Sequence, residues 1–297
     1  RKAKELALEY KKPLAVVNHM EGHLLSGFAQ PKRRVKEEKD VELLEMLKTS
    51  STYPTLGILV SGKHTEFVIT EKIGTYDVVG NTLDDACGEA FDKAGRMLGF
   101  GYPGGPVIGE FAEEHRKNIK LSIRNENRST LIKATNKNSG EEYELPVAMA
   151  RSGDLNVSYS GLKTAFNQLI ESLQENDEVL TKEQLMDLSV IFEAAAFEPI
   201  LIKAQRAIRK YEPKQIWLGG GVVANNELKR RIRKLARQND LDLYYPTTKK
   251  LTTDNAAMIG LVVNIREYTG ALDELLKEPQ REVFEKIDRS PRQKLNQ

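Results

Sequence analysis

The segment QIWLGGGVVANNELKRRIRKLARQ at 215–238 decides the fold class. Its first four residues predict a short strand, and the apolar positions that recur after the glycines predict a helix from about Asn225 to Asn239. A further apolar run at 241–245 predicts another strand directly after that helix. Strand, glycine turn, helix and strand in succession indicate an α/β fold.

The same alternation of strands and helices runs through the rest of the chain. We expect strands at 14–17, 55–61 and 66–70, of which the last two form a hairpin around Gly62. We expect further helices at 1–11, 83–98, 161–175, 181–211 and 254–270, with the 181–211 helix interrupted near Pro199. Residues 31–40 and 117–150 are expected to be polar surface segments, the second with a weak hairpin. Glycine turns follow several strands, and ligands bind at such strand ends in open α/β sheets.

Composition excludes several classes of protein. The chain has 297 residues, of which 40% are apolar and 30% charged, as in ordinary soluble domains. Lys plus Arg number 45 and Asp plus Glu 43, so net charge alone does not indicate a nucleic-acid binder. Cys87 is the one cysteine, which excludes a disulfide framework and fits a reducing cytoplasm. Because no apolar run approaches the roughly 20 residues of a membrane helix, we expect a cytoplasmic protein without a membrane partner.

The segment HMEGH at 19–23 has the spacing of a metal site. His19 and His23 are four residues apart, so they share one face of a helix that Asn18 is placed to cap. Two imidazoles in this arrangement can hold a metal ion, although two histidines without a metal explain the pattern equally well. A zinc peptidase needs a glutamate directly after the first histidine. Here a methionine stands there, and Glu21 lies roughly 200° round the helix from His19.

A third ligand must come from elsewhere in the chain. Asp254 stands in the segment TDN at 253–255, before the last expected helix. An aspartate at that place is first of all a plausible N-cap. The sequence spacing leaves both roles open.

Two glycine-rich turns follow expected strands. The turn SGKHT at 61–65 lets backbone N–H groups reach a phosphate or carboxylate, but a plain hairpin turn is the simpler explanation. Gly219 to Gly221 stand before a helix, whose N-terminus favours an anion. They lack the spacing of a dinucleotide fingerprint or a P-loop, so the sequence favours a nucleotide contact of another kind.

Two helices carry concentrated charge of one sign. Asp85, Glu89 and Asp92 fall at i, i+4 and i+7, where like charges cost a few tenths of a kcal/mol per pair. Such a stripe suits a solvated face, or a cleft that holds a metal or sugar hydroxyls. The segment SYSGLKT at 158–164 offers either a helix cap or a phosphate contact. Six cations make the helix after Gly221 either a solvated face or a nucleic-acid-facing patch: Lys229, Arg230, Arg231, Arg233, Lys234 and Arg237.

Six segments, taken together and in order, resemble the bacterial form of the tRNA threonylcarbamoyltransferase family. They are VNHMEGHLLS at 17–26, LVSGKHTEFV at 59–68, GNTLDDACGEAFDKAGRMLGFGYPGGP at 80–106, SYSGLKTAF at 158–166, LGGGVVANNEL at 218–228 and TDNAAMIG at 253–260. The resemblance covers nearly the whole chain. Six ordered segments are far more specific than any one of them.

The resemblance implies a fold of the actin and sugar-kinase type, in which two lobes flank a cleft. We expect residues 1–52 to be the remainder of the N-terminal lobe. Residues 53–253 would form the second lobe with the glycine loops, and residues 254–297 a C-terminal helix that returns to the first lobe. The family begins with a Gly-Ile-Glu-Thr-Ser type segment that this chain, which opens at Arg1, lacks, so we expect its N-terminal segment to be missing.

The resemblance also implies site residues, position by position. The metal ligands would be His19, His23 and Asp254, and the ion one divalent metal, Fe²⁺ or Zn²⁺. The residues expected to line the threonylcarbamoyl-adenylate are Leu59, Val60, Ser61, Gly62, Lys63, Asp92, Gly105 and Asn225. Asp92 is expected to meet the ribose hydroxyls. Lys63 stands where the family usually has a second glycine.

The activity implied is transfer of threonylcarbamoyl from threonylcarbamoyl-AMP to N6 of the adenosine beside the anticodon, in tRNAs that read codons beginning with A. The implied partners are tRNA, an inactive paralogue of the same fold and a small ATPase. Two alternatives stay open. One is a related enzyme on the same fold, such as a carbamoyltransferase or a sugar kinase. The other is an inactive or truncated binding subunit, although such a subunit would not need the metal residues.

Overall fold

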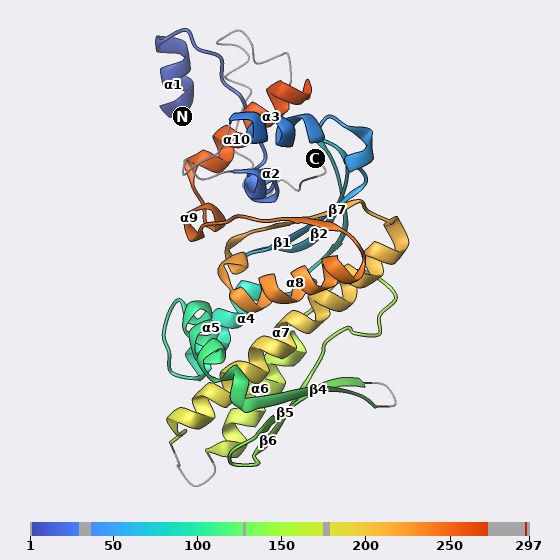
Figure 1. The fold of residues 1–297 in the computed structure, drawn as a ribbon. Helices are drawn as coiled ribbons and strands as arrows, with labels where there is room; N and C mark the ends of the chain where they lie inside the picture. The colour runs from blue at the N-terminus through green and yellow to red at the C-terminus, as the bar shows by residue number, and fades with distance from the viewer. Residues whose placement is uncertain (1, 30–36, 127–128, 175–178, 273–294, 296–297) are drawn as a thin grey trace.

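A computed structural model describes residues 2–29, 37–126, 129–174, 179–272 and 295 (Figure 1). Its strands form a five-stranded mixed sheet in the order β3-β2-β1-β7-β8 and a three-stranded antiparallel sheet in the order β4-β5-β6. Helices pack on both sheets, so the α/β class predicted from the sequence is confirmed.

The elements have the following bounds. The strands are β1 (Thr55–Val60), β2 (Thr65–Lys72), β3 (Thr75–Asn81), β4 (Ile119–Glu126), β5 (Ser129–Asn136), β6 (Glu142–Pro146), β7 (Gln215–Gly219) and β8 (Asp242–Tyr244). The α-helices are α1 (Lys2–Glu9), α2 (His19–Leu25), α3 (Glu37–Met46), α4 (Cys87–Met97), α5 (Gly104–His115), α6 (Ser160–Leu173), α7 (Lys182–Tyr211), α8 (Asn226–Gln238), α9 (Lys249–Thr252) and α10 (Ala256–Thr269).

The centre of the large sheet is β1, which is buried along its whole length. It pairs antiparallel with β2, as the expected hairpin requires, and parallel with β7. Parallel strands end at the same edge of a sheet, so the turns that follow β1 and β7 meet there. Gly220 has φ +99°, and a Cβ atom at this residue would lie 2.4 Å from the carbonyl oxygen of Val60. Only glycine allows this close approach of the two strand ends.

Alternate residues of β1 enter two different hydrophobic cores, as the period of two in a strand requires. Leu56, Ile58 and Val60 belong to the larger core, to which α4, α7 and α8 contribute. Leu59 faces the opposite side and joins a smaller core with Trp217 and residues of α2 and α10. The two helices α2 and α10 therefore lie together on one face of the sheet.

The long helix α7 connects the two sheets (Figure 1). It contacts β5 and β6 near its start and packs on β1 and β2 further along. Asn136 at the end of β5 donates hydrogen bonds to the buried Asp187 carboxylate of α7, at 3.0 and 3.1 Å. His115 from α5 reaches the same carboxylate at 2.8 Å. These polar contacts attach the small sheet to the rest of the molecule.

Several sequence-based expectations are wrong. Residues 14–17 are not a strand, because no described strand pairs with them, and the Val16 side chain is 45% exposed. Pro199 does not interrupt α7, which stays continuous with Pro199 buried inside it. Residues 37–40 begin α3 rather than belonging to a loop, and 31–36 lie outside the described residues.

The segment 117–150 holds more structure than expected. Instead of a weak hairpin it forms the complete β4–β6 sheet, in which β4 and β5 pair over eight residues each. The expected helix at 83–98 begins only at Cys87, and α10 begins at Ala256 rather than at Asp254. The predicted division at residues 1–52, 53–253 and 254–297 stays a prediction. None of the helices in the described part of the chain has the length and apolar character needed to cross a bilayer.

Candidate active site

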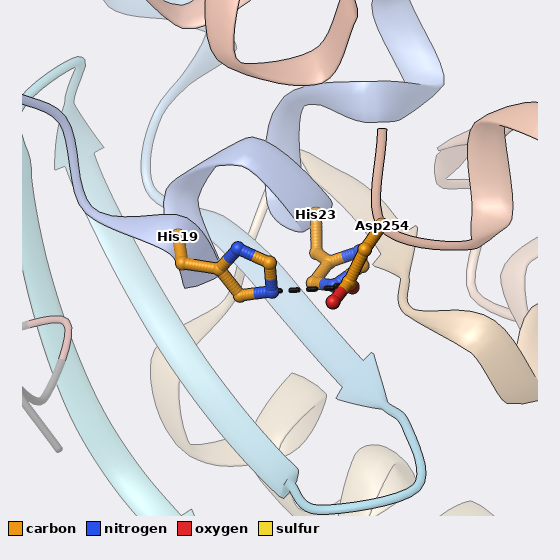
Figure 2. A group of neighbouring side chains, drawn as sticks. All are labelled: His19, His23 and Asp254. Atoms are coloured by element: carbon orange, nitrogen blue, oxygen red, sulfur yellow. Dashed lines mark hydrogen bonds and ion pairs between the residues drawn. The ribbon is translucent and has the colours of Figure 1, made fainter. Parts of the chain in front are cut away.

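The two histidines of the HMEGH segment occupy the start of α2. Asn18 caps this helix as predicted, because its Oδ1 accepts a hydrogen bond from the backbone N–H of Met20 at 2.8 Å. The cap fixes the first helical residue at His19. His23 then lies one turn later on the same side, and the two imidazoles point to one place (Figure 2).

Asp254 reaches the histidines from the other end of the chain. The segment before α10 contains both an aspartate and an asparagine, and Asn255 supplies the cap by accepting from the Met258 N–H at 2.9 Å. The Asp254 carboxylate is therefore not used as the helix cap. It faces the two imidazoles instead (Figure 2), so the cap role is excluded and the role of metal ligand stays a prediction.

The three side chains converge at distances that suit a shared ion. Asp254 Oδ1 lies 3.1 Å from His23 Nε2 and 3.2 Å from His19 Nε2, and one ligand atom from each residue lies within 4.8 Å of the others. Two ligands about 2.1 Å from a tetrahedral ion are about 3.4 Å apart. The carboxylate thus already has ligand spacing to both imidazoles. Two nitrogens and one oxygen are a donor set that both zinc and iron accept.

Exposure differs strongly within this cluster. The His23 side chain is 4% exposed, whereas His19 is 50% and Asp254 77% exposed. One ligand is thus fixed inside the protein and two face solvent. This leaves an ion at the cluster accessible to a substrate, as a catalytic metal site requires.

Burial, and then the neighbouring His19, lower the pKa of His23. The pKa of His64 is lowered in the same way, by burial first and then by His19 and Lys63. A lowered pKa keeps an imidazole neutral near pH 7, and only the neutral form can bind a metal. Three of the four histidines therefore gather here, and His64 is a neighbour that the sequence motif did not single out.

Glu21 points away from the cluster, as its position on the helix predicted. It is fully buried and accepts two hydrogen bonds from the Arg266 guanidinium of α10, at 2.9 and 2.6 Å. Tyr76 of β3 donates a third hydrogen bond to it at 2.6 Å. Glu21 is therefore a structural link between α2 and α10 and is not placed to act as the base of a zinc peptidase.

A cavity of about 970 Å³ opens beside the cluster. Thr253, the residue before Asp254, is one of its lining residues, whereas the three cluster residues are not, so the cavity approaches the cluster on the Asp254 side. Four of the residues expected to bind the adenylate also line it: Gly62, Asp92, Gly105 and Asn225. Since they come from β1's turn, α4, α5 and the loop before α8, the fold brings together residues that the chain separates widely.

Two of these lining residues also hold helix ends. Asp92 Oδ1 accepts hydrogen bonds from the N–H groups of Gly104 and Gly105, the first residues of α5, at 2.9 and 3.3 Å. Asn225 Oδ1 accepts from the Leu228 N–H at 3.0 Å and so caps α8. Their orientation in the cavity is consequently set by the helices that they cap.

The remaining expected adenylate residues do not line this cavity. Leu59 and Val60 are buried inside β1, where they pack in the two cores. Ser61 closes the turn, because its Oγ accepts from the backbone N–H groups of Lys63 and His64 at 3.2 and 3.0 Å. Lys63 is exposed. Of these four residues only Ser61 holds the turn through its side chain, and the adenylate contact expected of all four stays a prediction.

Glu193 of α7 lines the cavity and was not predicted from the sequence. Its buried carboxylate accepts a hydrogen bond from Asn225 Nδ2 at 2.6 Å and pairs with Arg116. A signal existed, because a lone glutamate between Phe192 and a run of alanines is rarely left in an apolar interior without a partner.

The acidic stripe and the SYSGLKT segment turn out to neutralise each other. Lys93 pairs with Asp85 at 2.7 Å and with Glu89 at 2.9 Å, and Lys163 pairs with Asp85 as well. Asp84 accepts from the Tyr159 N–H at 2.7 Å, just before α6. The cap of α6 thus comes from Asp84 and not from the SYSGLKT segment, whose N-cap residue Tyr159 makes no side-chain cap hydrogen bond. The phosphate contact stays a prediction.

Comparisons with known proteins identify a family for the chain. The family model described as tRNA N6-adenosine threonylcarbamoyltransferase matches residues 41–261. Three bacterial proteins of that name are similar to the chain. The one from Endomicrobium trichonymphae is 36% identical over 89% of this chain and 64% of its own length. The one from Syntrophomonas wolfei is 34% identical over 87% and 63%, and the one from Streptococcus suis 36% over 90% and 65%. The chain thus spans slightly less than two thirds of these relatives.

Proposed function

Because the chain belongs to the tRNA N6-adenosine threonylcarbamoyltransferase family, we propose that it transfers threonylcarbamoyl from threonylcarbamoyl-AMP to N6 of the adenosine beside the tRNA anticodon, in tRNAs that read codons beginning with A. Its fold class is that of the actin-like ATPases. The observation that carries the proposal is the convergence of His19, His23 and Asp254, next to the cavity-lining residue Thr253.

The proposed reaction forms one covalent bond and breaks another. The adenosine N6 attacks the threonylcarbamoyl carbonyl carbon, the bond from that carbon to the phosphate oxygen breaks, and AMP leaves with the electron pair. The N6 nitrogen gives up one proton. No redox change occurs, so the protein needs to hold two substrates in line and to stabilise the negative charge that develops on oxygen.

His19, His23 and Asp254 would hold one divalent ion, Fe²⁺ or Zn²⁺. Bound there, such an ion supplies a Lewis acid for the threonylcarbamoyl oxygens. The low pKa of His23 keeps its imidazole neutral and ready to bind. The small donor set and its exposed members suit an ion that also contacts substrate.

The cavity residues would hold the AMP part. Gly62 offers close backbone approach, since a Cβ atom there would meet nothing within 4 Å. Asp92 would meet the ribose hydroxyls through the oxygen that does not bind the start of α5, and Asn225 lines the cavity at the start of α8. Positioning of this kind accounts for a large share of the rate in group-transfer enzymes.

We further propose that the protein acts in the cytoplasm together with an inactive paralogue of the same fold and a small ATPase. The tRNA substrate follows from the name that the matching family carries. The other two partners rest on the resemblance of the sequence to that family.

The test is to measure metal content and transfer in cluster variants. His19→Ala and His23→Ala should each lose bound iron or zinc, measured by mass spectrometry of the purified chain, and lose transfer of threonylcarbamoyl onto tRNA. Asp254→Asn should do the same. Its matched control is Asp240→Asn, an identical change at an exposed residue with φ +54°, a conformation that asparagine also tolerates, and it should keep both properties. Full transfer by a variant that binds no metal would defeat the proposal.

A further inference from the structure

One side of α8 carries a concentration of positive charge. Leu228, Ile232 and Leu235 are buried on the inner side of the helix. Six of the other ten residues of the helix are cations, namely Lys229, Arg230, Arg231, Arg233, Lys234 and Arg237. Since the whole chain has a formal net charge of only +2, this charge is local to the helix.

The six cations divide into two groups. Arg230 and Arg231 both pair with the buried Glu227, at 2.7 and 2.6 Å from its oxygens, and Arg231 also pairs with Glu198 at 3.1 Å. The other four, Lys229, Arg233, Lys234 and Arg237, make no ion pair with a carboxylate in the described part of the chain. Arg233 only donates to the neutral hydroxyl of Tyr245 and stacks over its ring, 5.5 Å from the centroid.

The stability of the fold does not account for the presence of these four cations. Lys229 and Arg233, and again Arg233 and Arg237, are four residues apart, where like charges cost a few tenths of a kcal/mol per pair. Burial lowers the pKa of Lys229, and the nearby charges of Arg233 and Lys249 lower it further. The fold tolerates this repulsion, and an anionic ligand would relieve it.

The cations line a groove rather than a flat surface. Its volume is about 350 Å³, and its lining consists of Arg230, Arg233, Lys234, Arg237 and Gln238. Every lining residue is a hydrogen-bond donor, and four of the five are charged. A docking surface for another protein would normally have aromatic or aliphatic residues at its centre, and none of the five lining residues is of that kind.

The groove and the 970 Å³ cavity both border α8. Asn226 and Glu227, in the first turn of α8, line the 970 Å³ cavity, and so does Lys249. Figure 1 shows α8 between the five-stranded sheet and α7. From Lys229 to Arg237 the helix rises about 12 Å, a length over which one nucleic-acid strand carries three or four phosphates.

From these observations we infer that Lys229, Arg233, Lys234, Arg237 and Lys249, together the α8 basic face, bind the phosphate backbone of the tRNA whose adenosine enters the cavity. The inference rests on the proposed function for the identity of the nucleic acid. Arginine and lysine contacts to phosphates set the position of a nucleic acid without reading its sequence. The α8 basic face would thus fix where the tRNA lies, while the cavity selects the reacting base.

The test compares two double variants with the same change of charge. Lys234→Gln with Arg237→Gln removes two exposed cations of the α8 basic face. Lys72→Gln with Lys214→Gln is the control, because both are exposed and lie beside Thr55, at the end of β1 opposite the cavity turn. Each double variant takes the formal net charge from +2 to 0.

Binding of the full chain to an unmodified tRNA is measured by fluorescence anisotropy between 50 and 200 mM salt, about the range in which phosphate contacts are best resolved. The α8 variant should bind about 10-fold more weakly at the lower salt. Its slope of log K against log salt should be shallower by about 1.5, since each lost phosphate contact contributes about 0.7 to 0.9. The control should match the parent chain. Lys234→Gln alone should give half the change in slope, and thermal melts should show that each variant is folded.

Equal slopes for the two double variants would overturn the inference. The inference would also be overturned if the α8 variant lost binding to polyglutamate, used as a model of an acidic protein, and kept its binding to tRNA. The α8 basic face would then be a docking surface for an acidic protein. A transfer assay on the same samples separates this inference from the proposed function. A parent chain that binds tRNA through these residues and transfers nothing contradicts the function alone. A parent chain that transfers, with an α8 variant of unchanged KM for tRNA, contradicts the inference alone.

Discussion

Two glycines determine how closely α4 and α5 approach each other. A Cβ atom at Gly95 would lie 2.4 Å from the Cα atom of Gly104, a backbone atom that cannot move independently. This approach matters for the cavity, because Asp92 on α4 binds the first N–H groups of α5. The absence of a side chain at Gly95 therefore maintains the shape of the site.

Gly95→Ala should lower the free energy of unfolding by about 3 kcal/mol, the upper part of the range for overpacked cores. It should also weaken binding of AMP, because α5 moves away from Asp92. Urea denaturation and calorimetric titration with AMP measure the two effects. Gly260→Ala is the control, since Gly260 is also inside a helix and a Cβ atom there meets nothing within 4 Å. That variant should gain up to about 1 kcal/mol, and a Gly95→Ala protein as stable as the parent would contradict the packing argument.

At the scale of an element, α8 is held in place by Glu227. Burial alone would raise the pKa of this carboxyl, but the hydrogen bonds and charges of Arg231 and Arg116 outweigh burial and lower the pKa below its usual 4.5. A depressed folded-state pKa contributes stability above the unfolded-state pKa, and that stability is lost as pH falls through the folded-state value.

Glu227→Gln should therefore cost about 2 kcal/mol of unfolding free energy at pH 7, as expected for lost hydrogen bonds to a charged group. The difference from the parent chain should shrink as the pH falls below 4.5, because the parent's own carboxyl then becomes protonated. Urea denaturation at pH 7 and pH 3.5 tests this. Glu71→Gln, at an exposed position, should match the parent at both pH values. A difference that does not depend on pH would show that the charge of Glu227 is not the cause.

The elements also show what the sequence could and could not predict. The β1–β2 hairpin, β7 and α8 were predicted because each has a local pattern of apolar residues and glycines. The β4–β6 sheet was underestimated, since β4 is almost wholly exposed and the buried positions of β5 include Thr130 and Asn136. Polar residues at buried positions conceal the alternation on which strand prediction depends. Pro199 stays within a continuous helix because burial of its neighbours on α7 outweighs one missing hydrogen bond.

The candidate site, too, has parts that a local sequence pattern predicts and parts that it does not. The spacing of His19 and His23 is local and could be recognised, and the resemblance supplied Asp254. That Asn255 takes the cap, leaving Asp254 to face the imidazoles, depends on how α10 docks on α2. Glu193 approaches Asn225 only in the folded chain, from 32 residues away. Contacts between distant segments are the part that a single sequence does not contain.

At the scale of the whole molecule, the ion pair of Glu21 and Arg266 joins two segments 245 residues apart. It lies between α2, which carries both histidines, and α10, which follows Asp254. Since Glu21 is fully buried, its charge depends on Arg266 for compensation. The pair consequently fixes the two halves of the histidine–aspartate cluster relative to each other.

Arg266→Met should lower the free energy of unfolding by about 3 kcal/mol, because it leaves a buried carboxylate unpaired. Glu21→Gln combined with Arg266→Met should be less destabilised than the sum of the two single variants, which a double-mutant cycle by urea denaturation measures. Both single variants should also bind the divalent ion more weakly than the parent chain. Additive effects, or unchanged metal affinity in both single variants, would show that the pair does not position the cluster.

Asp92 and Asn225 each have two roles, and this affects how the effects of natural alleles at these positions should be interpreted. Each side chain lines the cavity and caps a helix, so a change at either position lowers the amount of folded protein as well as its catalysis. Under the proposed function, cells with such an allele would show undermodified tRNA for two reasons at once. His19 caps no helix and is half exposed, so an allele at His19 would leave protein abundance intact and report on catalysis alone.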